Sequence, residues 1–128
     1  MSSELSILAL AGLLTMVQIL AHVLTAQSQV GLPYLISPRD EARHLTGIPG
    51  RCKRAAENAV VAFALFAPAV LLVQAQGGLT PATLRVAQVF LIARVVYAVV
   101  YPLGTRWVRT IAWLVGFLAT AWLYVGAI

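Results

Sequence analysis

Four long stretches of this sequence contain almost no charge, and they limit what the chain can fold into. Each is close to the about 20 apolar residues that a helix needs to cross a hydrocarbon core about 30 Å thick. The composition agrees, because 61% of the 128 residues are hydrophobic and 10% are charged. We therefore predict an all-α integral membrane protein, a four-helix bundle in one domain over residues 1–128. The expected helices are about 5–27, 51–76, 81–101 and 107–128.

Proline and glycine mark where these helices should end or bend. Residues 28–50 contain three prolines and three glycines and predict a long loop. Pro68 should kink the second helix without ending it, because neighbouring helices can satisfy freed backbone groups. Gly77 and Gly78 should stop that helix, and Thr80 followed by Pro81 predicts the start of the next. We expect the first stretch to be a retained membrane helix and not a signal peptide. The segment MSSE before it contains no Lys or Arg, and its apolar run is longer than that of a signal peptide.

The basic residues predict an orientation in the membrane. The chain carries a net charge of +5, but its cations are too sparse for nucleic-acid binding, and no aromatic and basic run makes a stacking groove. Arg85 lies near a helix start, at the opposite side from most other cations. The positive-inside rule then predicts cytoplasmic first and third connections, with both termini extracytoplasmic. Those connections hold Arg39, Arg43, Arg51, Lys53, Arg54, Arg106 and Arg109.

A polar stripe runs along the first helix. Thr15, Gln18, His22 and Thr25 are spaced by three and four residues and so share one helical face. That face should point away from lipid. We expect Gln18 and His22 to serve helix packing, with a place at the border of a binding pocket as the alternative.

Arg94 lies deep within the third hydrophobic stretch, where an ionisable side chain is costly and indicates a functional site. Tyr97 and Tyr101 follow at spacings of three and seven, so all three residues share a face. A phenol donates a hydrogen bond to an anion, and a guanidinium holds a carboxylate through two donors. This face is a candidate anion site.

The second stretch presents a matching face with Arg54, Glu57 and Asn58. Glu57 is expected to pair either with Arg94 across helices or with Arg54 on its own helix. One interpretation is that these groups neutralise one another and set helix register. The other is a polar pocket, open to the cytoplasmic face, that holds an anionic ligand, because the donors outnumber the carboxylates available to them. No metal site is expected.

These residues resemble a known family. The segment RCKRAAEN before an apolar run that ends in a proline, the segment ARVVYAVVY, and a further arginine at the start of the last helix are similar to the MAPEG family. Its members are membrane-associated proteins in eicosanoid and glutathione metabolism. The length, the helix layout and the loop SPRDEARHLTGIPGR most resemble the small bacterial members, and the resemblance covers nearly the whole chain.

The resemblance implies a homotrimer in the bacterial inner membrane, with glutathione as a bound cosubstrate between neighbouring subunits near the cytoplasmic side. By position, Arg109 matches the arginine that activates the thiol, and Arg106 is the competing alignment. A guanidinium there would stabilise the reactive thiolate. The implied glutathione-binding residues are Arg54, Asn58, Arg94, Tyr97 and Tyr101, with Glu57 as a shifted acid.

The chain departs from the family pattern at Val61, where an acid is expected, and at Ala62, where an aromatic is expected. The first functional hypothesis is a glutathione transferase or peroxidase acting on lipophilic electrophiles from the bilayer. The second is a noncatalytic MAPEG-type scaffold that binds a lipid or another partner. A small multidrug exporter is disfavoured, because the first helix has no embedded acid and only Glu4 at its end.

Overall fold

The computed structural model describes residues 3–128, and this part of the chain is helical without a strand. Within it, four helices are long and apolar enough to cross a membrane. A fifth, short helix lies in the first connection. The elements are α1 (Glu4–Val30), α2 (Leu32–Leu35), α3 (Gly47–Ala75), α4 (Pro81–Val100) and α5 (Trp107–Gly126). The predicted all-α membrane bundle is confirmed.

The first connection is shorter than the sequence suggested, and the expected loop over 28–50 is wrong at both ends. Helix α1 continues to Val30 and ends at Gly31, whose φ of 84° lies in the left-handed region that glycine tolerates. Helix α3 begins at Gly47, although Pro49 lies in its first turn. Proline fits there because the first backbone N–H groups of a helix have no partner within the helix.

Helix α3 passes through Pro68 without ending, as predicted. The proline lacks a backbone N–H, so the turn before it loses one internal hydrogen bond. In that turn, the hydroxyl of Tyr124 donates to the carbonyl oxygen of Leu65 at 2.6 Å. This bond from α5 ties the last helix to the proline-containing turn of α3.

The turn between α3 and α4 also follows the local sequence. Gly77 has a φ of 67°, and the N–H of Gly78 donates to the carbonyl of Val73 at 2.9 Å, which closes the end of α3. Thr80 caps α4 by accepting from the N–H of Thr83, while the Thr83 hydroxyl accepts from the N–H of Thr80. The predicted stop and start of these two helices are confirmed.

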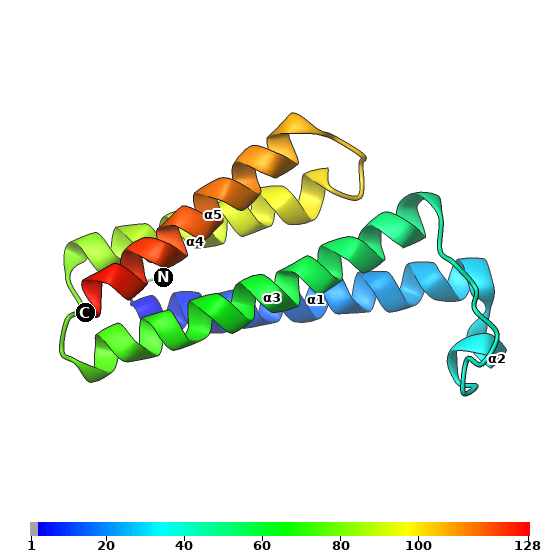
Figure 1. The fold of residues 1–128 in the computed structure, drawn as a ribbon, viewed down its shortest axis with the longest axis horizontal. Helices are drawn as coiled ribbons and strands as arrows, with labels where there is room; N and C mark the ends of the chain where they lie inside the picture. Colours follow the sequence, from blue (N-terminus) through cyan, green and yellow to red (C-terminus); the bar gives the residue numbers. More distant parts are fainter. Residues whose placement is uncertain (1–2) are drawn as a thin grey trace.

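The long helices form two antiparallel pairs, α1 with α3 and α4 with α5 (Figure 1). The pairs lie close together at the end that holds both termini and diverge toward the other end. At the diverging end, Arg51 Nε donates to the carbonyl oxygen of Pro102 at 2.8 Å and links the start of α3 to the α4–α5 connection. We call this the basic end. It includes Arg39, Arg43, Arg51, Lys53, Arg54, Arg106 and Arg109.

The apolar core is concentrated away from the basic end. Phe66 of α3 and Phe90 of α4 stack there with ring centroids 3.8 Å apart. Many of the buried residues are alanines, and small side chains let membrane helices approach closely. The larger cluster of this core comprises Ile7, Ala11, Phe66, Ala69, Val70, Val73, Ala87, Phe90, Leu91, Ala119, Leu123 and Ala127, and a smaller one comprises Ala55, Tyr97 and Ala112.

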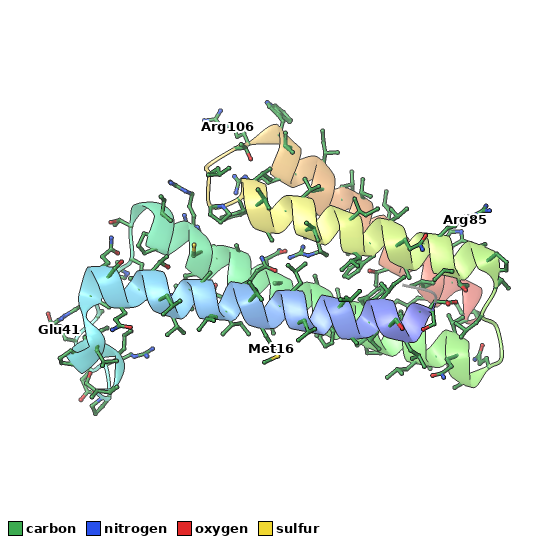
Figure 2. All side chains as sticks on the ribbon, turned by 180° about the vertical axis from the view of Figure 1, so that it is seen from behind. Met16, Glu41, Arg85 and Arg106 are labelled. Carbon is green, nitrogen blue, oxygen red and sulfur yellow. The ribbon has the colours of Figure 1, made fainter. Side chains whose placement is uncertain are left out.

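The outer surface is apolar between two polar ends. Met16 and its large neighbours along α1 are exposed, as are Trp113 and Phe117 on α5. Figure 2 shows Arg106 and Glu41 toward one end and Arg85 toward the other. Such a surface suits a lipid environment, because exposed leucine, valine and aromatic side chains are stable there without burial in protein.

Candidate functional site

Arg94 of α4 is buried, with 4% of its surface exposed. Its Nη1 donates to the Asn58 side-chain oxygen of α3 at 2.8 Å. Its guanidinium carbon lies 4.4 Å from the centroid of the Tyr97 ring, a cation–π arrangement on the same helix. Its Nη2 is buried and has no hydrogen-bond partner among residues 3–128. Arg94 therefore retains donor capacity that the described protein leaves unused.

Two tyrosines continue this site toward the basic end. The rings of Tyr97 and Tyr101 lie 5.2 Å apart. Arg54 Nε of α3 donates to the Tyr101 hydroxyl at 3.3 Å, and the Arg109 guanidinium of α5 lies 4.8 Å from the Tyr101 ring centroid. Three helices thus contribute to one set of side chains, which we call the arginine–tyrosine cluster. Its members are Arg54, Asn58, Arg94, Tyr97, Tyr101 and Arg109.

Glu57 does not make either of its expected pairs. It is exposed on the surface of α3 and lies 4.0 Å from Lys53 Nζ, one turn earlier on the same helix. The neighbouring residue, Asn58, takes the place opposite Arg94 instead. Successive residues on a helix point about 100° apart, so only one of the two can face α4.

The arginine–tyrosine cluster is therefore strongly cationic. Across residues 3–128, its three arginines form no ion pair with a carboxylate. Glu41 pairs with Arg43 in the first connection, and Glu4 accepts a hydrogen bond from Thr83 at the opposite end of the bundle. The arrangement suits an anion, because guanidinium and phenol groups supply charged and neutral donors side by side.

The structure separates the two candidate arginines of the last helix. Arg109 is half-buried against Tyr101, and its Nε is buried without a partner in the described chain. Arg106 is exposed and precedes the first residue of α5. Figure 2 shows Arg106 at the outer edge of the α4–α5 connection. The geometry places Arg109 in the cluster, while the catalytic role of either residue stays a prediction.

The polar stripe of α1 faces the bundle, as predicted, and brings Gln18 to the site. Gln18 is 7% exposed, and both polar atoms of its side-chain amide lack partners among the residues described. Gln18 and Arg94 line the same small cavity of about 10 Å³, close to the space of one water molecule. Gln18, expected mainly to pack helices, therefore borders the site.

An apolar pocket of about 470 Å³ lies beside Arg94, between α3, α4 and α5. Arg94 and Asn58 supply part of its polar lining, and Val61, at the position where the family pattern has an acid, supplies part of its apolar wall. The α5 side of this pocket could not be predicted from the sequence, because an apolar residue that faces a pocket and one that faces lipid have the same sequence pattern. That side comprises Trp113, Gly116, Phe117, Thr120, Ala121, Tyr124 and Val125.

These features define an integral, multi-pass membrane protein of four apolar helices with a buried cationic site. The chain belongs to the MAPEG family, whose family model matches residues 5–128. Comparisons with curated proteins and with solved structures give no match.

Proposed function

We propose that this protein is a membrane-embedded glutathione transferase or peroxidase that acts on lipophilic electrophiles. One observation carries the proposal: a carboxylate-free cluster of three arginines and two tyrosines adjoins an apolar pocket, with Arg94 and Asn58 shared between them. Glutathione carries two carboxylates and reacts through a thiolate, so it suits the cluster. A lipophilic second substrate suits the pocket, because its lining is mostly apolar and includes Phe117 and Val125, which are exposed on the surface of the bundle.

In this proposal Arg54 and Arg94 hold the glutathione carboxylates, and Arg109 stabilises the thiolate. In the transferase reaction, sulfur forms a bond to an electrophilic carbon. The leaving group, or the oxygen of an opened ring, takes the bonding electron pair and then a proton from water. In the peroxidase reaction, two glutathione molecules are oxidised to the disulfide while a hydroperoxide is reduced to an alcohol and water.

The proposal includes the assembly and location that the family resemblance implied. The protein would form a homotrimer in a bacterial inner membrane, with glutathione bound between neighbouring subunits near the cytoplasmic side. The concentration of cations at the basic end supports the orientation with both termini extracytoplasmic.

A noncatalytic MAPEG-type protein that binds a lipid is the second candidate. It is favoured by the apolar Val61 in the pocket wall and by Glu57, which is exposed beside Lys53 and leaves the cluster without an acid for the glutathione amine. In such a protein the pocket would hold a lipid without reaction.

Titration of glutathione into the detergent-solubilised full chain tests the proposal. Wild type should bind glutathione and develop thiolate absorbance, and Arg94→Ala should lose binding by at least tenfold, since a hydrogen bond to a charged group contributes about 1.5–3 kcal/mol. Arg85→Ala is the control, because Arg85 is exposed at the opposite end. Thermal unfolding and gel filtration would verify that each variant is folded. Absence of binding in folded wild type would overturn the glutathione assignment.

Arg109→Ala separates the enzyme from the lipid-binding protein. If the protein is a transferase, this variant should retain glutathione binding and lose thiolate absorbance and turnover with a lipophilic electrophile. Arg106→Ala should retain glutathione binding, thiolate absorbance and turnover, because Arg106 is exposed outside the cluster. Wild type that binds glutathione without forming thiolate or product would favour the noncatalytic alternative.

A further inference from the structure

Another cavity lies at the basic end, apart from the arginine–tyrosine cluster. It has a volume of about 400 Å³ and is bounded by the last turns of α1, by α2 and the loop after it, and by the start of α3. One part of its lining is cationic and the other is apolar. The cationic part comprises Arg39, Arg43 and Lys53, with His22 next to them.

The two loop arginines are held in place by helix ends. Arg39 donates through Nε and Nη2 to the Leu35 carbonyl at 3.1 and 2.8 Å, and Arg43 donates through Nη1 to the Val30 carbonyl at 3.3 Å. Arg39 has a φ of 59°, a left-handed conformation that residues with a side chain rarely adopt. Each guanidinium has five N–H donors, so both keep donors for a ligand.

The carboxylates near this cavity do not cancel its charge. Arg43 pairs with Glu41 at 3.4 Å and Lys53 pairs with Glu57 at 4.0 Å, and all four side chains are exposed to solvent. Asp40 and Glu41 line an adjoining loop pocket together with Arg39 and Arg43, and neither they nor Glu57 lines this cavity. Arg39 has no ion pair with any carboxylate among the residues described. The cavity therefore presents a net positive wall.

The apolar part of the lining is unusually open. Leu32 is 50% exposed and Ile36 is 78% exposed, one on α2 and the other directly after it. Val23 of α1 is also exposed and lines the same cavity. Large apolar side chains next to cations, where a spanning helix ends, match the boundary between acyl chains and headgroups.

We propose that this cavity binds an anionic phospholipid. The lipid phosphate would lie against Arg39, Arg43 and Lys53, and an acyl chain would follow α1 past Val23. Charge complementarity selects an anionic headgroup over a zwitterionic one, because basic residues beside a membrane attract anionic lipids by about 1 kcal/mol each. The apolar lining selects a lipid over a water-soluble phosphate.

The test is native mass spectrometry of the full chain in detergent with dioleoyl phosphatidylglycerol or dioleoyl phosphatidylcholine. Wild type should retain more phosphatidylglycerol than phosphatidylcholine. Lys53→Gln and Arg39→Gln should each weaken that retention about fivefold, the factor that corresponds to about 1 kcal/mol per charge. Arg106→Gln is the matched control, an exposed arginine at the same end that does not line the cavity, and it should behave as wild type.

Three outcomes would overturn the proposal. Equal retention of the two lipids by wild type would show that the cavity does not select an anionic headgroup. If Arg106→Gln retained as little phosphatidylglycerol as Lys53→Gln, the loss would reflect only the net charge of the protein. Displacement of the lipid by millimolar glycerol phosphate would assign the cavity to a soluble phosphate. Lys53 is exposed on α3, so Lys53→Gln should fold. If Arg39→Gln fails to fold, the lipid retention of Lys53→Gln still tests the proposal. Glutathione titration of the same variants keeps this result separate from the proposed enzymatic function.

Discussion

Arg94 shows how a single buried charge is accommodated in this protein. One of its terminal nitrogens donates to Asn58, its planar group lies beside Tyr97, and its other terminal nitrogen faces no described acceptor. The sequence located Arg94 because an arginine in the middle of an apolar helix is costly. It did not identify Asn58 as the partner, because both Asn58 and Glu57 were within reach by spacing alone.

Asn58→Leu should lower the stability of the protein by about 1 kcal/mol, since Arg94 would lose its only described side-chain acceptor and membrane hydrogen bonds contribute about that much. Asn58→Asp is the control, because it keeps an oxygen acceptor opposite the guanidinium. Unfolding of both variants in a graded denaturing detergent measures the difference. Equal stability of wild type and Asn58→Leu would show that the bond contributes little.

At the level of helices, α4 is fixed at its start by more than its own cap. The Thr83 hydroxyl accepts from the N–H of Thr80 at 2.8 Å and donates to the Glu4 carboxylate of α1 at 2.6 Å. Glu4 is only 6% exposed. An acid that the sequence placed merely at a helix end therefore joins two helices, which local capping rules could not indicate.

Thr83→Val should destabilise the bundle more than Thr80→Val. Both changes remove one side chain of the reciprocal cap, at a cost of about 1 kcal/mol. Thr83→Val also leaves the buried Glu4 carboxylate without its donor, which adds about 1–3 kcal/mol. The two valine variants have the same shape change, so each controls for the other in detergent unfolding. Identical losses would mean that the Glu4 bond has no net effect.

Across the whole molecule, the apolar core and most of the cationic side chains lie at opposite ends of the bundle. The apolar core lies where the helix pairs meet, and the cations gather where the pairs diverge (Figure 1). The arginine–tyrosine cluster and the apolar pocket lie between α3 and the α4–α5 pair. The polar site is tolerated there because its side chains contact one another: Arg94 donates to Asn58, Arg54 donates to Tyr101, and the Arg94 guanidinium lies against the Tyr97 ring.

Cysteine labelling tests the proposed orientation of the whole chain. In a Cys52→Ser background, Gln76→Cys should react with a membrane-impermeant maleimide on intact spheroplasts. His44→Cys should react only after the membrane is permeabilised, because the two exposed positions lie at opposite ends of α3. The reverse pattern would invert the topology. Labelling of both positions from one side would contradict a membrane-spanning α3.

The sequence by itself determined the four membrane helices, the start of α4 at Pro81 and the shared face of Arg94 and its tyrosines. These features are local, because apolar length, capping and helical periodicity depend on neighbouring residues. Tertiary structure alone decided that Asn58, and not Glu57, faces Arg94, and that α5 forms the wall of the apolar pocket. Those outcomes depend on how each helix is rotated and where the pairs diverge, and these are properties of packing between distant segments.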